Sequence, residues 1–199
     1  MRFLLLSLVT FFYSSTAFAQ MTDTTELPYQ QIPDYPADYS PGNILARMID
    51  GLGFRYYWAT EGLTDTDLAF TPSEGSRSTQ ETLVHIYGLS ETIVNAPQNQ
   101  PNIRPANHSN LSFDTLRYRT LANLKQASEL CQGKSADEVA ELTIVFQREE
   151  RSSQFPYWNM INGPIADAIY HTGQIVVFRR TSGNPINSKV NVFLGRTDF

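Results

Sequence analysis

The chain has 199 residues, a formal net charge of −5 and a single cysteine. This mildly acidic balance gives no electrostatic signal for nucleic acid or anionic lipid, and we expect neither as a partner. An intramolecular disulfide is excluded, and the place of Cys131 in a predicted helix favours a small buried side chain over a nucleophile.

The first 19 residues have the composition of a secretory signal peptide. Met1 and Arg2 form a short basic start, an apolar run follows from Phe3 to Phe12, and Ala17-Phe18-Ala19 fits an A-x-A cleavage site. A membrane anchor is the alternative, but the apolar run is too short to span a bilayer of about 30 Å. We therefore expect an exported protein, periplasmic or secreted, with no membrane span after cleavage of residues 1–19.

Residues 20–41 are predicted to form an extended or disordered tether. Pro28, Pro33 and Pro36 lie there among polar residues, and apolar residues follow neither a helical nor an alternating pattern. The remainder, residues 42–199, is long enough for one domain with its own core.

The first helix is predicted to begin after Ser40-Pro41-Gly42. Apolar residues recur at three- and four-residue steps from Ile44 to Tyr56, which is the pattern of a helix with one buried face. Gly51 and Gly53 in its middle weaken this prediction.

A short connection and a loop over residues 63–75 lead to a second helix with a clear start. Ser78 and, three residues later, Glu81 form the sequence of a capping box in front of an apolar run. The proline-containing segment 97–105 is expected to end this helix.

The third helix is predicted to be capped by Asn110 or Ser112 and to be followed by Gly133, which suits the position after a helix. Ser135-Ala136-Asp137-Glu138 repeats the capping-box pattern and indicates a short helix. The β-branched apolar run 142–146 has the composition of a strand. A single strand would have no partner for its backbone groups, so we expect irregular structure there.

The fourth helix is predicted to follow Asn162-Gly163-Pro164, with the proline in its first turn, and to end at Gly183 and Pro185. Four helices joined by polar loops predict an all-α fold of the helix-bundle type.

The side chains best suited to metal chemistry lie on the second and fourth predicted helices. His85 lies in the middle of one, and His171 lies in the middle of the other, four residues after Asp167. Residues four apart share a helix face, so Asp167 and His171 can bind one ion together with a residue of a facing helix. Two histidines and a carboxylate leave coordination positions open, as catalytic sites require. Gln174 falls on the same stripe and can hold a ligand by a hydrogen bond.

A purely structural interpretation of these residues stays open at this point. A histidine in the middle of a helix is often a hydrogen-bonded core or boundary residue. Asp167, in the first turn of its helix, interacts favourably with the helix dipole without any metal. His108 lies in a loop and is interpreted as solvent-exposed.

Two motifs, far apart and in the expected order, resemble the DinB/YfiT-like superfamily. The first is the segment Leu63–His85, a loop with Pro72 and Ser78 that enters a helix bearing one histidine. The second is Asn162–Ile175, in which His171 is followed by the family's x-G-Q.

The resemblance, which covers Gly42–Phe178, implies an up-and-down four-helix bundle that binds a divalent metal through three histidines, often zinc or nickel. His85 and His171 match two of these histidines, whereas Asp167 stands where the family has the first histidine of H-x-x-x-H. A site of two histidines and one aspartate favours a harder ion, so iron or manganese joins zinc and nickel as a candidate. A degenerate site that has lost its metal is the alternative.

The activity that the resemblance implies is metal-dependent hydrolysis or transfer to a thiol, in which the metal lowers the pKa of a water or thiol. The substrate would be a small molecule that no sequence feature selects. The alternative is a non-catalytic bundle that binds a ligand or a partner and whose metal site is structural or lost. Dimer formation through an exposed helix face also stays open.

Overall fold

The computed structural model describes residues 26–197. The predicted signal peptide, residues 1–19, lies outside the described residues, as do the first residues of the predicted tether. Among the described residues, none of the helices combines the length and the apolar character that are needed to cross a membrane.

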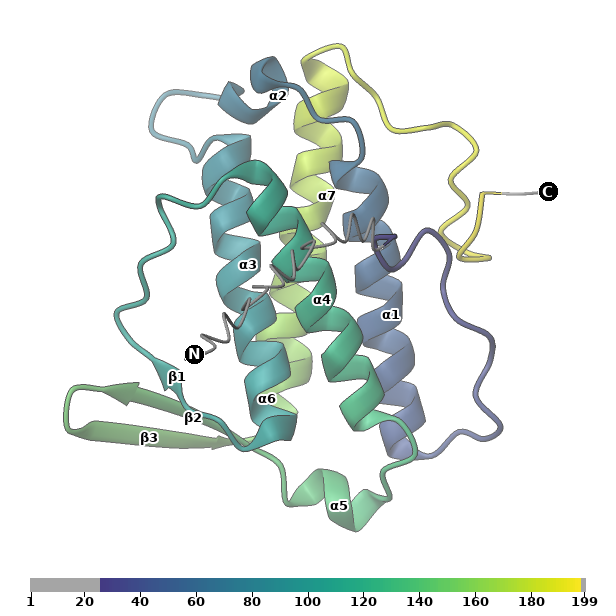
Figure 1. The fold of residues 1–199 in the computed structure, drawn as a ribbon, viewed down its shortest axis with the longest axis vertical. Coiled ribbons are helices and arrows are strands. Elements are labelled where there is room, and N and C mark those ends of the chain that lie inside the picture. Colours follow the sequence, from purple (N-terminus) through teal and green to yellow (C-terminus); the bar gives the residue numbers. More distant parts are fainter. Residues whose placement is uncertain (1–25, 198–199) are drawn as a thin grey trace, which may run out of the picture.

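Four long helices form the body of the molecule and lie side by side (Figure 1). They are α1 (Pro41–Thr60), α3 (Thr79–Asn95), α4 (Phe113–Cys131) and α7 (Ala166–Thr181). Both α1 and α3 pack against α4 and against α7, so α1 and α3 lie diagonally opposite each other.

The long helices do not simply alternate in direction. Gly42, at the start of α1, donates its N–H to the Lys134 carbonyl just after α4, so these two helices are antiparallel. Arg179, near the end of α7, donates to carbonyls at the end of α1, so those two are parallel. The segment 96–112 returns along the outside to the opposite end before α4 begins, so α3 and α4 run in the same direction (Figure 1). This order differs from the up-and-down alternation that the family resemblance implied.

A small three-stranded sheet accompanies the helices. β1 (Asn102–Ile103) pairs in parallel with β2 (Thr143–Arg148), which pairs antiparallel with β3 (Arg151–Pro156). The prediction of irregular structure over residues 142–146 is therefore wrong, because the partner strand follows directly after a turn in which Glu149 has a φ of 53°. The all-α class is corrected accordingly to a helix-rich fold with a small sheet.

The predicted helix caps are largely present. Ser78 and Ser135 each form a complete capping box, and Ser112, not Asn110, caps α4. Gly133 follows α4 with a φ of 76°, a conformation that favours glycine. Three short helical segments complete the connections: α2 (Asp65–Ala69), η1 (Ala96–Gln98) and α5 (Ala136–Ala140).

The helical path that leads into α7 begins earlier than predicted. It starts with α6 (Trp158–Met160) and continues through a π-helical segment, η2 (Ile161–Ile165), directly into α7. Gly163 has non-helical angles of φ −97° and ψ −106°, and Pro164, which has no backbone N–H, lies inside this stretch. Proline and π-helical insertions are common causes of kinks. The last long helix, α7, thus follows Asn162-Gly163-Pro164 and ends before Gly183 as predicted, but a kink and not a free end precedes it.

Residues 26–40, which we call the N-terminal strap, lack regular secondary structure as expected, but they pack onto α1. Tyr29 is only 6% exposed, and its ring lies against Gly53, where a Cβ atom would come within 2.5 Å of the ring. Trp58 donates its indole N–H to the Gln30 carbonyl. The glycine that weakened the helix prediction is thus the point at which the strap approaches the helix backbone.

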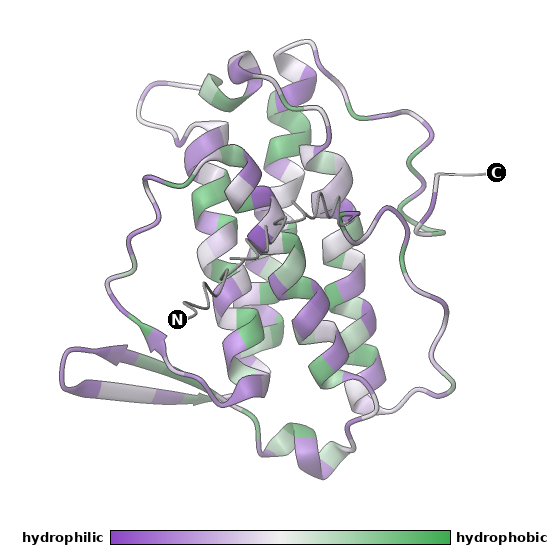
Figure 2. Ribbon diagram, viewed as in Figure 1, coloured by the Kyte–Doolittle hydropathy of each residue, from purple (hydrophilic) through white to green (hydrophobic). Residues whose placement is uncertain are grey.

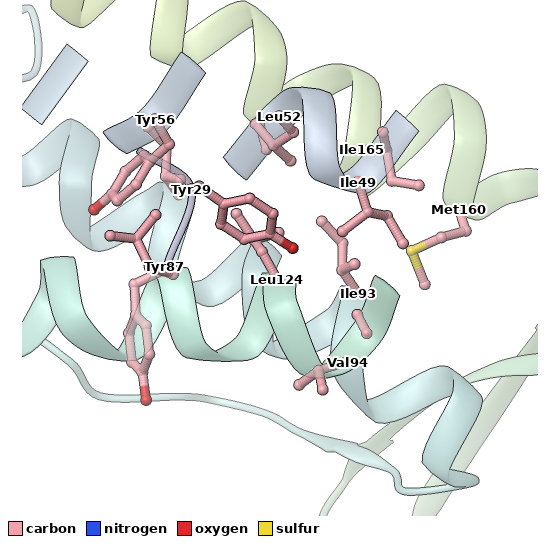
Figure 3. Close-up of a cluster of buried hydrophobic side chains, with 14 of the residues drawn as sticks. Tyr29, Ile49, Leu52, Tyr56, Tyr87, Ile93, Val94, Leu124, Met160 and Ile165 are labelled. Carbon is pink, nitrogen blue, oxygen red and sulfur yellow. The ribbon is translucent and has the colours of Figure 1, made fainter. Parts of the chain in front are cut away.

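The core lies between the long helices and includes the strap tyrosine. Figure 3 shows Tyr29 beside Ile49 and Leu52 of α1 and Leu124 of α4, and the three aliphatic side chains are completely buried. Figure 2 shows apolar and polar residues mixed along each long helix, whereas the tip of the β2–β3 hairpin is hydrophilic. Burial of one face of each helix therefore supplies most of the apolar contact, and the hairpin adds Ile144 of β2 to the core.

Candidate metal centre

Three predicted ligands from two facing helices meet at one point. His85 belongs to α3, whereas Asp167 and His171 lie one turn apart on α7, which packs against α3. One ligand atom from each of the three residues lies within 4.8 Å of the other two, a spacing at which they could hold one ion. The sequence analysis thus named a group that the fold brings together across 82 positions of the chain.

The aspartate lies between the two histidines. The distance from His85 Nε2 to Asp167 Oδ2 is 3.1 Å, and the distance from His171 Nε2 to Asp167 Oδ1 is 3.3 Å. The two imidazole rings meet edge to face, with centroids 4.6 Å apart and planes at 90°. Each oxygen of the carboxylate therefore faces one histidine nitrogen, so interaction with the helix dipole alone does not account for its orientation.

The local structure explains why Asp167 lies where it does. Ile165 has helical angles of φ −70° and ψ −52°, so α7 continues directly from η2 and does not start from a free end. The kink at Gly163 and Pro164 precedes the first turn of α7 and sets its path past α3. On the other helix, the capping box of Ser78 fixes where α3, which carries His85, begins.

Gln174 favours one tautomer of His171. Its amide oxygen Oε1 lies 2.7 Å from His171 Nδ1, and because an amide oxygen only accepts, this contact suits the tautomer with an N–H at Nδ1. In the neutral imidazole, Nε2 then carries a lone pair, and this lone pair faces the Asp167 carboxylate at 3.3 Å. Two electron-rich groups at this distance repel one another unless a proton or a metal ion lies between them. The arrangement therefore suits a bound cation, and Gln174 occupies the supporting position that the sequence predicted.

The group is partly open to solvent. The exposed fractions of the side chains are 31% for His85, 41% for Asp167 and 12% for His171. Burial lowers the pKa of His85, with the hydrogen bond to Asp167 opposing it and the charge of Arg77 adding to it. A lowered pKa favours the neutral imidazole that binds metals. An ion held here would keep one side accessible to a small molecule.

Two neighbours of the group were not singled out by the sequence. Tyr170 is 64% exposed, and its ring centroid lies 5.3 Å from that of His171. Arg77, in the loop before α3, is close enough to act on the charge of His85. The sequence could have indicated Tyr170, because this aromatic residue directly precedes the predicted ligand His171. Arg77 carries no comparable signal, because its position depends on the path of the loop.

The remaining predicted features lie elsewhere. His108 is partly buried and not solvent-exposed as interpreted, because its side chain is only 19% exposed. Its Nε2 lies 2.7 Å from Glu91 Oε2, at the distance of an ion pair, and its ring packs edge-on against Tyr87. The interpretation is wrong because the loop folds back onto α3. Cys131 is completely buried, as predicted, and burial raises the pKa of its thiol, which does not suit a nucleophile.

No protein-family model matches this chain, and neither a curated protein nor a solved structure shows significant similarity to it. The functional argument therefore rests on the residues and on their geometry.

Proposed function

We propose that this chain is an exported member of the DinB/YfiT-like superfamily, with its four long helices forming a four-helix bundle. In this proposal, His85, Asp167 and His171 bind one divalent metal ion. The observation that carries it is the convergence of three ligand atoms within 4.8 Å, from the two helices that bear the family-like motifs. A bundle that places ligands on facing helices is a common way to build such a site.

The donor set fits a divalent cation. Gln174 holds the proton on His171 Nδ1 and so directs the Nε2 lone pair at the same point as the Asp167 carboxylate. A divalent ion bound by these residues would act as a Lewis acid that lowers the pKa of a water or a thiol for hydrolysis or transfer. Asp167 supplies a negative charge that a third histidine would not. This charge favours harder ions, so iron and manganese stand beside zinc and nickel as candidates.

The second candidate is a non-catalytic bundle that binds a small ligand or a partner. It is favoured by one observation: Asp167 already contacts both histidines at hydrogen-bonding distance. Protonated imidazoles could satisfy this carboxylate without any ion, so the same geometry is compatible with a degenerate site.

Elemental analysis of the mature protein tests the metal centre itself and separates it from the degenerate, metal-free form of the second candidate. The protein is purified without a polyhistidine tag or chelators and is reloaded with zinc, nickel, iron or manganese. We expect about one ion per chain in the wild type, as structural and catalytic sites of this kind hold. The ion should be lost in His85→Ala and in His171→Ala.

His108→Ala is the matched control. It removes the third histidine of the chain, which is also partly buried and paired with a carboxylate. This variant should keep its ion. Absence of metal under every loading condition would contradict the metal centre and favour the second candidate, and equal loss in His108→Ala would show that the loss reflects unfolding.

A further inference from the structure

A cavity of about 370 Å³ lies beneath the N-terminal strap. Residues of the strap, of α1 and of α4 line it, and none of its lining residues belongs to the candidate metal centre. Cavities that hold small molecules start near this size. Figure 3 shows Tyr29 of the strap reaching into the helix core beside α1, so the wall that closes this cavity is anchored in the protein interior.

A buried carboxylate that forms no ion pair among the described residues lines the cavity. Asp50 of α1 is only 8% exposed, and the Tyr29 hydroxyl donates to its Oδ1 at 3.0 Å. Among residues 26–197, no lysine, arginine or histidine forms an ion pair with Asp50. A buried charge is costly unless it is paired. The Asp50 carboxylate therefore needs either a proton or a cation that residues 26–197 do not supply.

The two cationic side chains that line the cavity make their closest contacts with other residues, although the charge of Arg47 also acts on Asp50. Arg47 donates to the Pro33 carbonyl at 2.8 Å, and its guanidinium lies over the Tyr35 ring at 4.8 Å from the centroid. Lys125 lies 3.8 Å from Glu129. The lining also carries two further carboxylates, those of Asp34 and Glu129, so negative charge exceeds positive charge around the cavity.

We propose that this cavity binds a small organic cation whose primary ammonium group donates to the Asp50 carboxylate. An ammonium group supplies both the missing positive charge and N–H donors. The lining combines a single deep carboxylate with proline, alanine and tyrosine side chains, which suit the alkyl part of such a molecule. A metal ion fits less well, because among the described residues only the group of His85, Asp167 and His171 brings three ligand side chains together.

The behaviour of Asp50 without a ligand agrees with this assignment. Burial raises the pKa of Asp50, against the lowering by the hydroxyl groups of Ser128 and Tyr29 and by the charge of Arg47. The environment thus disfavours an isolated charge at this position. An ammonium ligand would restore the ionised form by pairing with it.

The test is a calorimetric titration of the full mature protein with three probes at constant ionic strength. These are n-butylammonium, 1-butanol as an uncharged molecule of the same length, and γ-aminobutyrate as a zwitterion. We expect saturable binding of n-butylammonium and at least about tenfold weaker binding of 1-butanol, since the charged contact supplies the affinity. Tighter binding of γ-aminobutyrate than of the plain amine would indicate amino acids as the natural ligand class, and weaker binding would indicate simple amines. Either order supports the ammonium site.

Asp50→Asn keeps the size of the side chain and removes its charge, and it should weaken n-butylammonium binding by about tenfold or more. Glu150→Gln makes the same chemical change in the exposed hairpin turn and should bind as the wild type does. The proposal is overturned if n-butylammonium does not bind saturably, if 1-butanol binds equally well, or if folded Asp50→Asn binds like the wild type. Should Asp50→Asn fail to fold, the comparison of the amine with the alcohol in the wild type still decides.

Discussion

At the residue scale, Gln174 shows how one side chain can support the candidate metal centre. Its oxygen accepts from His171 Nδ1 at 2.7 Å and so leaves Nε2 free to bind an ion. Removal of such a supporting hydrogen bond typically lowers metal affinity by about 10- to 100-fold. We therefore expect Gln174→Leu to retain the fold and to bind its metal about 10- to 100-fold more weakly in competition with a chelator dye.

Gln126→Leu is the control for this prediction. Gln126 is an exposed glutamine of α4 that donates to the Gln98 side chain and lies outside the candidate metal centre, so its loss should leave metal affinity unchanged. Equal affinities for Gln174→Leu and the wild type would mean that Gln174 does not orient the ligand.

A second residue-scale prediction concerns acid stability. Asp67 of α2 is 2% exposed and accepts hydrogen bonds from Ser182, from Asn184 at 2.7 Å and from the Thr64 N–H at 2.9 Å. Burial by itself would raise the pKa of Asp67, but the hydrogen bonds of Ser182, Asn184 and Thr64 prevail and lower it from 3.8 to about 2.

Because the pKa of Asp67 is lower in the folded protein than in the unfolded chain, its ionised form stabilises the fold above pH 4 or so and this contribution is lost as the pH falls towards about 2. We expect Asp67→Asn to lower the free energy of unfolding by about 2 kcal/mol at pH 7, measured by urea denaturation. The difference between variant and wild type should shrink at pH 2 to 3. A difference that is the same at both pH values would show that ionisation of Asp67 is not the cause.

At the scale of elements, the sequence predicted helices better than strands. The capping boxes of Ser78 and Ser135 and the spacing of apolar residues along α1 are local signals. The structure confirms the helices that they predicted. The β2–β3 hairpin carries no such signal in its second strand, because all residues of β3 are exposed and do not alternate between apolar and polar. The kink before α7 depends on Gly163 adopting non-helical angles, which the packing of the neighbouring helices decides.

The contact between the strap and α1 leads to a prediction at this scale. A Cβ atom at Gly53 would lie 2.5 Å from the Tyr29 ring, so Gly53→Ala must displace either the ring or the helix backbone. Overpacking of this kind costs about 1 to 3 kcal/mol. We expect a loss of that size in the free energy of unfolding, measured by urea denaturation.

Gly88 is the matched control, since it also lies within a long helix but has no neighbouring atom within 4 Å of the position of a Cβ. Gly88→Ala should raise the free energy of unfolding by up to about 1 kcal/mol, because alanine loses less conformational entropy in a helix. If both variants shift stability in the same direction and by the same amount, steric contact with Tyr29 does not matter.

At the scale of the whole molecule, the sequence indicated the candidate ligands but could not show how their helices meet. His85, Asp167 and His171 followed from spacing on single helices and from a family resemblance, both of which are readable along the chain. The direction of α4 relative to α3 was not readable, because it depends on a connection that returns along the outside of the helices. Arg179 is another example: its place in the last turn of α7 indicates only a favourable charge, whereas the structure buries it against the carbonyls of Trp58, Ala59 and Glu61.

The candidate metal centre joins two helices, so removal of the proposed ion should act on the stability of the whole fold. An ion held by His85 on α3 and by Asp167 and His171 on α7 binds the folded state and has no preformed site in the unfolded chain. At a free metal concentration 100 times the dissociation constant, such binding stabilises a protein by about 2.7 kcal/mol. We therefore expect a chelator to lower the melting temperature of the metal-loaded wild type and to leave that of His85→Ala unchanged. A chelator that lowers both melting temperatures equally would locate the stabilising ion elsewhere, because His85→Ala retains every other side chain of the protein.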